Sequence, residues 1–295
     1  MYNNKNLVIV PVNFSEEAEN GAVYALQIAT GINANIVLLN AYFNPALYVP
    51  GMLEPYSNLV SIEEDIRALE KEAYINLVAL KQLLDERINK EGISNVEVAY
   101  DLVQGYPVNA ILSYADEFKP NVIVMGSPGK KPGGITAFGK VTTRIMEKAN
   151  MPVIAVPIGY SAEQFTKPQK VLYLTSLDNT DYSALERLTG FARFFDARIL
   201  CVHTSTIQSN ESDEEKMRGI KKYIIKQLGV TNLECGILET ANPLSGLEKF
   251  INERGVDIIA FSTQKRNVLL RFFIPDSSHR YLHQTGIPLL VYHAR

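Results

Sequence analysis

The amino-acid sequence predicts an α/β fold with two tandem open-sheet domains, each a five-stranded parallel sheet flanked by helices. Short apolar runs alternate with segments of helical periodicity, which is typical of parallel sheets covered by helices. The alternation stops at residues 159–169, where polar and turn-forming residues gather, and then starts again. We therefore expect a first domain over residues 1–158, a linker over 159–169 and a second domain over 170–295.

The second domain is expected to repeat the first, because equivalent residues keep one spacing. The pairs that lie 136 positions apart are Pro107 and Pro243, Glu117 and Glu253, Ile123 and Ile259, and Pro152 and Pro288. This single offset runs through a helix, a strand, the following loop and a further strand, although loops normally absorb insertions. The constant spacing indicates an internal duplication.

The individual elements follow from the spacing of apolar residues. Strands are expected at 7–12, 36–39, 96–103, 122–125 and 153–156, and again at 171–174 and 199–202. Helices are expected at 18–29, 62–88, 108–118 and 141–149, and again at 182–195 and 217–228. Ser61 is a candidate N-cap of the long helix, with Glu64 completing a capping box. The acidic stretch 209–216 is expected to be a loop that leads into a helix. The aromatic-rich loop 43–58 suits a lid or a partner surface, and it equally suits an ordered loop packed over the core.

Composition excludes several classes of protein. The net charge is −3 and the isoelectric point about 5.9, so no overall charge favours nucleic acid or an anionic membrane as partner. We find no secretory h-region and no apolar run near the ~20 residues of a membrane span, and we expect a cytoplasmic protein. Cys201 and Cys235 form neither a disulfide framework nor a metal-binding spacing and are expected to be small buried apolar residues.

Ligands of open α/β sheets bind beyond the carboxyl ends of the strands. The first strand ends in Pro11-Val-Asn-Phe-Ser15, without glycine, and neither the dinucleotide fingerprint nor a P-loop is found, which argues against NAD enzymes and P-loop NTPases. After the fourth strand, residues 126–139 are rich in glycine and lead into a helix. Glycines, lysines and a helix N-terminus suit a phosphate, and the same composition also suits a solvated surface loop.

The glycine spacing resembles that of the universal stress protein family. Nucleotide-binding members carry Gly-x-x-Gly, nine residues and then Gly-Ser/Thr, and this chain has Gly126, Gly129 and Gly139 at those positions. The segments 152–157 and 10–15 also resemble the family's closing strand and its opening strand with turn. Counted as two copies, the resemblance covers almost the whole chain and implies an adenine nucleotide alpha hydrolase-like fold.

The resemblance also implies a ligand site in the first domain, for ATP or a related adenine nucleotide, with Mg²⁺ as its companion ion. The implied residues are Pro11, Asn13 and Ala41 around adenine, Met125 and Gly126 around ribose, and Gly129, Gly139, Lys140, Val141 and Thr142 around the phosphates. A homodimer is implied as well. Apolar terminal strands such as residues 289–292 are exposed edges unless they are paired, and this pairing can occur within the chain, between chains, or both.

Two residues depart from the family pattern in the first domain. Asn13 stands where Asp is usual, and its amide keeps an acceptor and adds a donor. Lys140 stands where Ser or Thr is usual, so a small hydroxyl is lost and a charge is gained that either pairs with phosphate or blocks its place. Thr142 and Thr143 are expected to supply hydroxyls one helical step further on.

The second domain departs further. The aligned stretch reads Ser262-Thr-Gln-Lys265 and then Pro275-Asp276, so all three motif glycines are absent. Pro275 has no N–H to donate, and Asp276 would repel a phosphate. We expect no ATP binding here, and we interpret Asp178 as a cap of the following helix rather than a remnant of an adenine site.

The remaining chemistry is sparse. His279 and His283 are spaced i, i+4, which indicates a helix surface pair more readily than a zinc site, and His203 is interpreted as packing. No nucleophile elbow occurs, so no catalytic residue is named. Two alternatives to a nucleotide switch stay open: an interaction module in which both sites have decayed, and an enzyme with a base or an acidic pair near residues 126–139.

Overall fold

The computed structural model describes residues 6–43, 59–128, 139–160, 167–205, 211–263 and 286–293. In the first half, the elements are β1 (Asn6–Pro11), α1 (Glu16–Ile32), β2 (Ala34–Tyr42), α2 (Leu59–Glu91), β3 (Val98–Gln104), α3 (Pro107–Phe118), β4 (Val122–Ser127), α4 (Lys140–Lys148) and β5 (Val153–Pro157). In the second half, they are β6 (Lys170–Leu174), α5 (Thr180–Phe195), β7 (Arg198–Ser205), α6 (Glu211–Lys226), β8 (Leu233–Glu239), α7 (Pro243–Arg254), β9 (Ile258–Thr263) and β10 (Leu289–His293).

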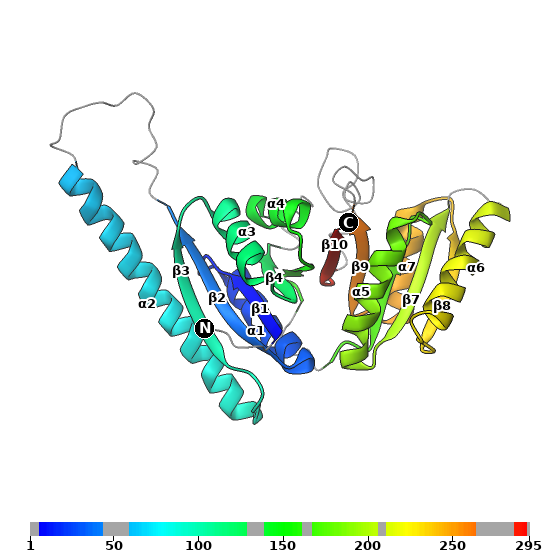
Figure 1. The fold of residues 1–295 in the computed structure, drawn as a ribbon, viewed down its shortest axis with the longest axis horizontal. Helices are drawn as coiled ribbons and strands as arrows, with labels where there is room; N and C mark the ends of the chain where they lie inside the picture. The colour runs from blue at the N-terminus through cyan, green and yellow to red at the C-terminus, as the bar shows by residue number, and fades with distance from the viewer. Residues whose placement is uncertain are drawn as a thin grey trace.

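All ten of these strands belong to one sheet with the order β3-β2-β1-β4-β5-β10-β9-β6-β7-β8 (Figure 1). Within each half the paired strands are parallel, and β5 and β10 join the halves as an antiparallel pair. The predicted α/β class with five parallel strands to a half is confirmed, but the two open sheets are joined into one mixed sheet.

The join is symmetric about one pair of residues. Ile154 of β5 lies opposite Leu290 of β10, and these residues are 136 positions apart, the offset found in the sequence. Strand β10 pairs with β5 on one side and with β9 on the other, so it has no open edge. Strand β10 therefore needs no second chain to cover its edge. The homodimer itself stays a prediction.

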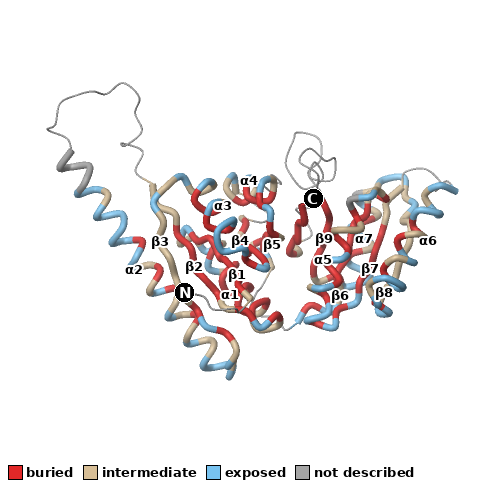
Figure 2. Tube along the Cα trace, in the orientation of Figure 1, coloured by how far each residue is buried: buried red, intermediate tan, exposed pale blue. Residues whose placement is uncertain are grey.

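The helices form one layer on each face of the sheet. Alternate strand residues point to opposite faces, and the buried side chains accordingly separate into two clusters. One cluster lies under α1, α2, α5 and α6, and the other lies under α3, α4 and α7. Figure 2 shows the buried strands between these layers and the largely exposed outer face of α2.

The first helix shows how local sequence sets an element. Ser15 caps α1 by accepting a hydrogen bond from the N–H of Ala18, and acidic residues in the first turn suit the helix dipole. The helix ends at Asn33, whose left-handed backbone (φ 53°) donates its N–H to the carbonyl of Ala29. Gly31 lies inside the helix, whose last residue is Ile32.

Two local predictions were wrong. Ser61 lies within α2, which already includes Leu59, so it is not the N-cap of that helix. Residues 211–216 are helical rather than a loop, because α6 begins at Glu211 and its first turn carries Glu211, Asp213 and Glu214, charges that the helix N-terminus favours.

The loop 44–58 and the histidines at 279 and 283 lie outside the described residues. No described helix is both long enough and apolar enough for a membrane crossing.

Gly31 generates a prediction about how the halves pack. A Cβ added to Gly31 of α1 would lie 2.0 Å from ring atom Cε1 of Phe195, a buried residue of α5. Gly31→Ala is therefore expected to lower the free energy of unfolding by about 1–3 kcal/mol, the usual cost of overpacking. Chemical denaturation of the full chain would measure the loss.

The control is the same change beside a smaller partner. In a Phe195→Ala background the ring is absent, so Gly31→Ala should cost little there. An equal cost in both backgrounds would mean that the contact between α1 and α5 does not depend on Gly31.

Candidate functional site

A cleft of about 470 Å³ opens at the carboxyl ends of β1, β2 and β4. Every site residue implied by the family resemblance lines it except Gly129, which lies outside the described residues, whereas Thr143, which was expected to add a hydroxyl, does not line it. The proposed residues in its lining are Pro11, Asn13, Ala41, Met125, Gly126, Gly139, Lys140, Val141 and Thr142. Segments more than 100 positions apart therefore meet at the edge where an open α/β sheet holds its ligands.

The turn after β1 holds Asn13 in a defined position. Phe14 adopts a left-handed backbone with φ 60°, and Asn13 Oδ1 accepts a hydrogen bond of 2.9 Å from Ser15 Oγ. The backbone N–H of Ser15 also donates to that oxygen, at 3.4 Å. The carbonyl of the amide is thus used within the turn, and the NH₂ group of this exposed side chain is the part suited to a ligand acceptor.

Asn40 is a lining residue that the sequence analysis missed. Its buried side chain donates from Nδ2 to the carbonyl of Val12, at 2.8 Å, and so ties the end of β2 to the end of β1. The signal was a polar residue inside an otherwise apolar strand. Pro107 and Ile111 of α3 also line the cleft, and nothing in their local sequence indicates that.

Gly126 serves the fold directly. A Cβ at this position would lie 1.9 Å from the carbonyl oxygen of Glu17, in the first turn of α1. From the other side, a Cβ on Gly21 of α1 would lie 2.6 Å from the backbone nitrogen of Gly126. The two glycines let α1 and β4 approach closely, so Gly126 is explained by packing before any ligand is considered.

Gly139 is different. It is the N-cap of α4, its backbone angles (φ −51°, ψ 147°) are open to any residue, and no heavy atom of the described residues lies within 4 Å of an added Cβ. The part of the fold that the structure describes therefore makes no demand for glycine here. The exposed Lys140 follows as the first residue of α4, and it and Glu17 are the charged members of the cleft lining among the described residues.

Thr142 does not replace the lost hydroxyl in the way expected from the sequence. It is buried, and its Oγ1 donates to the carbonyl of Gly126 at 3.2 Å. A phosphate oxygen needs a donor, and the proton of this hydroxyl is committed to the contact between α4 and β4. Thr143 donates its backbone N–H to the carbonyl of Gly139 at 3.0 Å, as a helical residue does.

The second half can be compared position by position. Ile9 pairs with Ile123, and Leu172 pairs with Ile259, so residues 163 positions apart are equivalent in β1 and β6. This places Leu177 opposite Phe14, and both have a left-handed backbone, with φ 61° and 60°. Asp178 is then equivalent to Ser15 and not to Asn13. The N-cap of α5 is Asn179, which corrects the interpretation of Asp178 as the cap.

A buried polar network occupies the place that corresponds to the cleft. The carboxylate of Asp181, which is 0% exposed, accepts hydrogen bonds from Tyr173 Oη and Thr175 Oγ1, both at 2.6 Å. Ser262 Oγ and the N–H of Asp178 also donate to it, at 3.4 and 3.3 Å. Burial, with the nearby Asp181 carboxylate, raises the pKa of Tyr173 well above its ordinary value, so the tyrosine keeps the proton it donates.

The first half has small or apolar residues at these positions. The equivalents of Tyr173, Thr175, Asp181 and Ser262 are Val10, Val12, Ala18 and Gly126, and the last three line the cleft. At these positions the second half thus has polar side chains that hydrogen-bond to one another, whereas the first half has small or apolar residues that leave the cleft open. His203 Nδ1 lies 2.9 Å from the carbonyl oxygen of Thr175, so it is hydrogen-bonded as well as packed.

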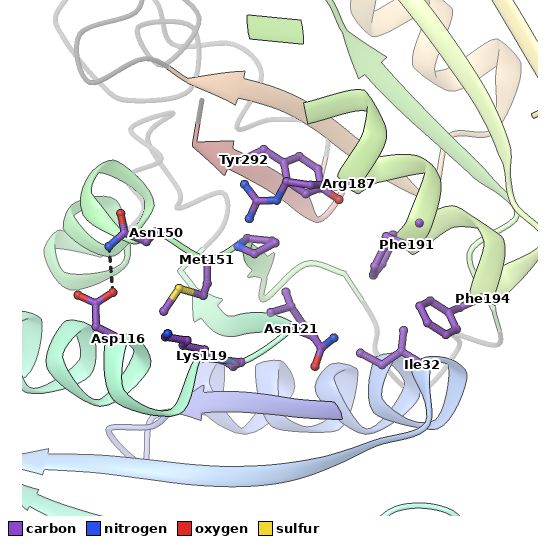
Figure 3. Close-up of a pocket in the computed structure, with 14 residues that line it drawn as sticks. Ile32, Asp116, Lys119, Asn121, Asn150, Met151, Arg187, Phe191, Phe194 and Tyr292 are labelled. Atoms are coloured by element: carbon purple, nitrogen blue, oxygen red, sulfur yellow. Dashed lines mark hydrogen bonds between the residues drawn. The ribbon is translucent and has the colours of Figure 1, made fainter. Parts of the chain in front are cut away.

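A larger cavity, of about 750 Å³, lies between the halves (Figure 3). It is bounded by Asn121 and Pro152, at the amino-terminal starts of β4 and β5, which is the opposite end from ligand sites of open sheets. Several of its polar groups are engaged: Asn150 donates to Asp116 at 2.9 Å, and Arg187 lies over the ring of Tyr292. Position and bonding therefore favour the smaller cleft as the candidate site.

The fold, a sheet of parallel half-sheets with a helix layer on each face, defines the class of the protein as α/β. The chain belongs to the universal stress protein family, because the profile of the "Universal stress protein family" matches residues 6–157, just over half of its length.

Two relatives come from Methanocaldococcus jannaschii. Universal stress protein MJ0531 is 27% identical over 160 residues, covering 52% of this chain and 85% of the relative. Universal stress protein MJ0577 is 24% identical over 151 residues, covering 50% of this chain and 93% of the relative. Both alignments thus span about half of this chain.

One solved structure is similar along the whole chain. It is a universal stress protein from Archaeoglobus fulgidus, with a TM-score of 0.73 and 17% sequence identity, and the alignment covers 99% of this chain and 100% of the other. At that identity the likeness concerns the fold, including both halves together.

The two glycines of the cleft generate a stability prediction. Gly126→Ala is expected to lower the free energy of unfolding by at least about 3 kcal/mol, the upper end of the overpacking range, because its Cβ meets backbone atoms that cannot turn away. Gly139→Ala is expected to be near neutral, since its Cβ meets no atom of the described residues. Thermal or chemical denaturation of both variants would test the contrast, and similar losses would contradict the division between them.

Proposed function

We propose that residues 1–158 form a universal stress protein domain that binds ATP or a related adenine nucleotide, and that residues 170–295 form a second such domain that does not. The ligand would make this cytoplasmic protein a switch in a stress response. The observation that carries the proposal is the cleft beyond β1, β2 and β4, because it gathers residues chosen from the sequence for their resemblance to nucleotide-binding members.

The lining offers groups that suit each part of a nucleotide. Pro11, Ala41 and Met125 supply apolar surface for a base, and the amide of Asn13 supplies hydrogen bonds to its edge. Gly139 and Lys140 stand at the start of α4, where unpaired backbone N–H groups and the helix dipole favour an anion. A nucleotide would arrive with Mg²⁺ on its phosphates. We assign no catalytic step to these residues.

The open position at Gly139 supports the proposal independently. A glycine that the fold does not require is explained when a ligand must approach the backbone closely. The volume of about 470 Å³ falls within the usual size of small-molecule sites. Lys140 is exposed and therefore has room to turn toward a phosphate or across the cleft.

The second domain is proposed to be closed. A phosphate or ribose would have to displace the carboxylate of Asp181 and leave the buried hydroxyls of Tyr173 and Thr175 without their acceptor. Unpaired buried donors cost about 1–3 kcal/mol each, and a phosphate beside the carboxylate would add repulsion between like charges. The tandem arrangement would then pair one ligand-binding copy with one structural copy.

Isothermal titration of ATP and of AMP, each with Mg²⁺, into the full chain tests the proposal. We expect one saturable site on each chain, since one cleft is open. Gly139→Trp should abolish the binding heat and leave the fold intact. The indole would project into the open cleft, where it displaces no packed side chain but occupies the space of the ligand. Unchanged affinity in Gly139→Trp would remove this cleft from consideration, and two sites on each chain would contradict closure of the second domain.

Lys140→Ser is the matched variant. If the lysine pairs with phosphate, the serine variant binds ATP more weakly than the wild type, and the difference is smaller for AMP. No binding by the wild type with binding by Lys140→Ser would show that the lysine closes the cleft. The protein would then act as an interaction module through self-association and protein partners.

A further inference from the structure

The two cysteines, 34 positions apart in the sequence, are neighbours in the sheet. Cys201 of β7 and Cys235 of β8 are direct partners in the register of these parallel strands. Their side chains lie on the same face, because Cys201 belongs to the core cluster under α5 and α6 and Cys235 packs against that cluster. The two thiols influence each other: the neighbouring thiol helps to raise the pKa of Cys201 and lowers the pKa of Cys235. The sequence indicated two separate buried apolar residues.

We propose that Cys201 and Cys235 are a thiol pair that a hydroperoxide oxidises to a reversible disulfide between β7 and β8. Neighbouring strands are about 4.8 Å apart, within the range of about 4.4–6.8 Å between Cα atoms that disulfides span. This spacing is toward the short end of the range, and a bond that departs from the preferred geometry is more easily reduced. That favours a reversible link over a permanent structural one.

The two thiols differ in access and in acidity. Cys201 is buried, whereas Cys235 is half-buried on β8, which is the outermost strand of the second half. The neighbouring Cys201 thiol lowers the pKa of the Cys235 thiol, and the Lys221 ammonium on α6 acts in the same direction, against burial and the Glu234 carboxylate. Glu234 is itself paired with Arg198 and Arg254, at 3.3 and 2.9 Å. Cys235 is therefore the thiol that reacts first.

The chemistry balances in two steps. The Cys235 thiolate attacks one oxygen of the hydroperoxide, an S–O bond forms, the O–O bond breaks, and the other oxygen leaves and takes up a proton as an alcohol or water. Cys201 sulfur then attacks the sulfur of the Cys235 sulfenic acid, an S–S bond forms, and the S–O bond breaks. The departing hydroxide takes the Cys201 proton as water. Two thiols give up two electrons, and the peroxide accepts them.

This site is separate from the proposed nucleotide cleft. The cysteines lie in the second half, and none of the cleft residues contributes to them. Oxidation would clamp the outer strand β8 to β7 in the domain for which no ligand is proposed. The proposal therefore stands or fails without reference to nucleotide binding.

The experiment is treatment of the folded full chain with hydrogen peroxide, followed by unfolding, alkylation of free thiols and mass spectrometry. The chain has only these two cysteines, so any disulfide within one chain must join them. We expect both thiols to be lost to alkylation, a mass lower by two hydrogens, and full recovery with dithiothreitol. A chain that keeps Cys201 free while Cys235 becomes sulfinic acid, or that links only to other chains, would overturn the proposal.

Single variants order the two steps. With Cys201→Ser, Cys235 should stop at a sulfenic acid that dimedone captures, whereas with Cys235→Ser the buried Cys201 should keep its thiol under the same treatment. Cys201→Ala, which places no hydroxyl in the core, replaces Cys201→Ser if circular dichroism shows that the serine variant is unfolded. Equal oxidation of Cys201 in the wild type and in Cys235→Ser would contradict the assigned order.

Discussion

The antiparallel pairing of β5 with β10 is the contact on which the architecture depends. A strand at the end of an open sheet presents a row of unpaired backbone groups, and each half of this chain ends in such a strand. Because Ile154 and Leu290 face each other at equivalent positions, the two edges satisfy each other inside one chain. The packing of α1 against α5, with Gly31 beside Phe195, follows from the same symmetric arrangement.

A second constraint positions the cleft. Gly21 and Gly126 allow α1 to lie against the end of β4 with no side chain between the two backbones. This contact places the turn of Asn13 and the start of α4 on either side of the same opening, and Asn40 and Thr142 then fasten the walls through Val12 and Gly126. The glycines of one sequence motif thus have distinct physical roles, since Gly126 is required by packing and Gly139 is not.

The two halves show how one backbone holds different interiors. The left-handed residues Phe14 and Leu177 give the first turn of each half the same shape. Around that turn, the first half leaves space and the second half fills the equivalent positions with the hydrogen-bonded network of Asp181. A buried carboxylate is tolerated because several donors satisfy it. The difference between the halves therefore lies in a few side chains and not in the path of the chain.

Apolar periodicity and glycine spacing are local properties, so the sequence was enough to predict the α/β class, most of the elements and residues that gather around the cleft. It did not determine the start of α2, nor the helical state of residues 211–216, where apolar residues are absent and the acidic charges suit the N-terminus of a helix. Only the tertiary structure decided that the halves share one sheet, that Gly126 is needed for packing, and that Cys201 lies beside Cys235. All three facts are contacts between segments that lie far apart in the sequence, and no local pattern in the chain specifies which distant segments will become neighbours.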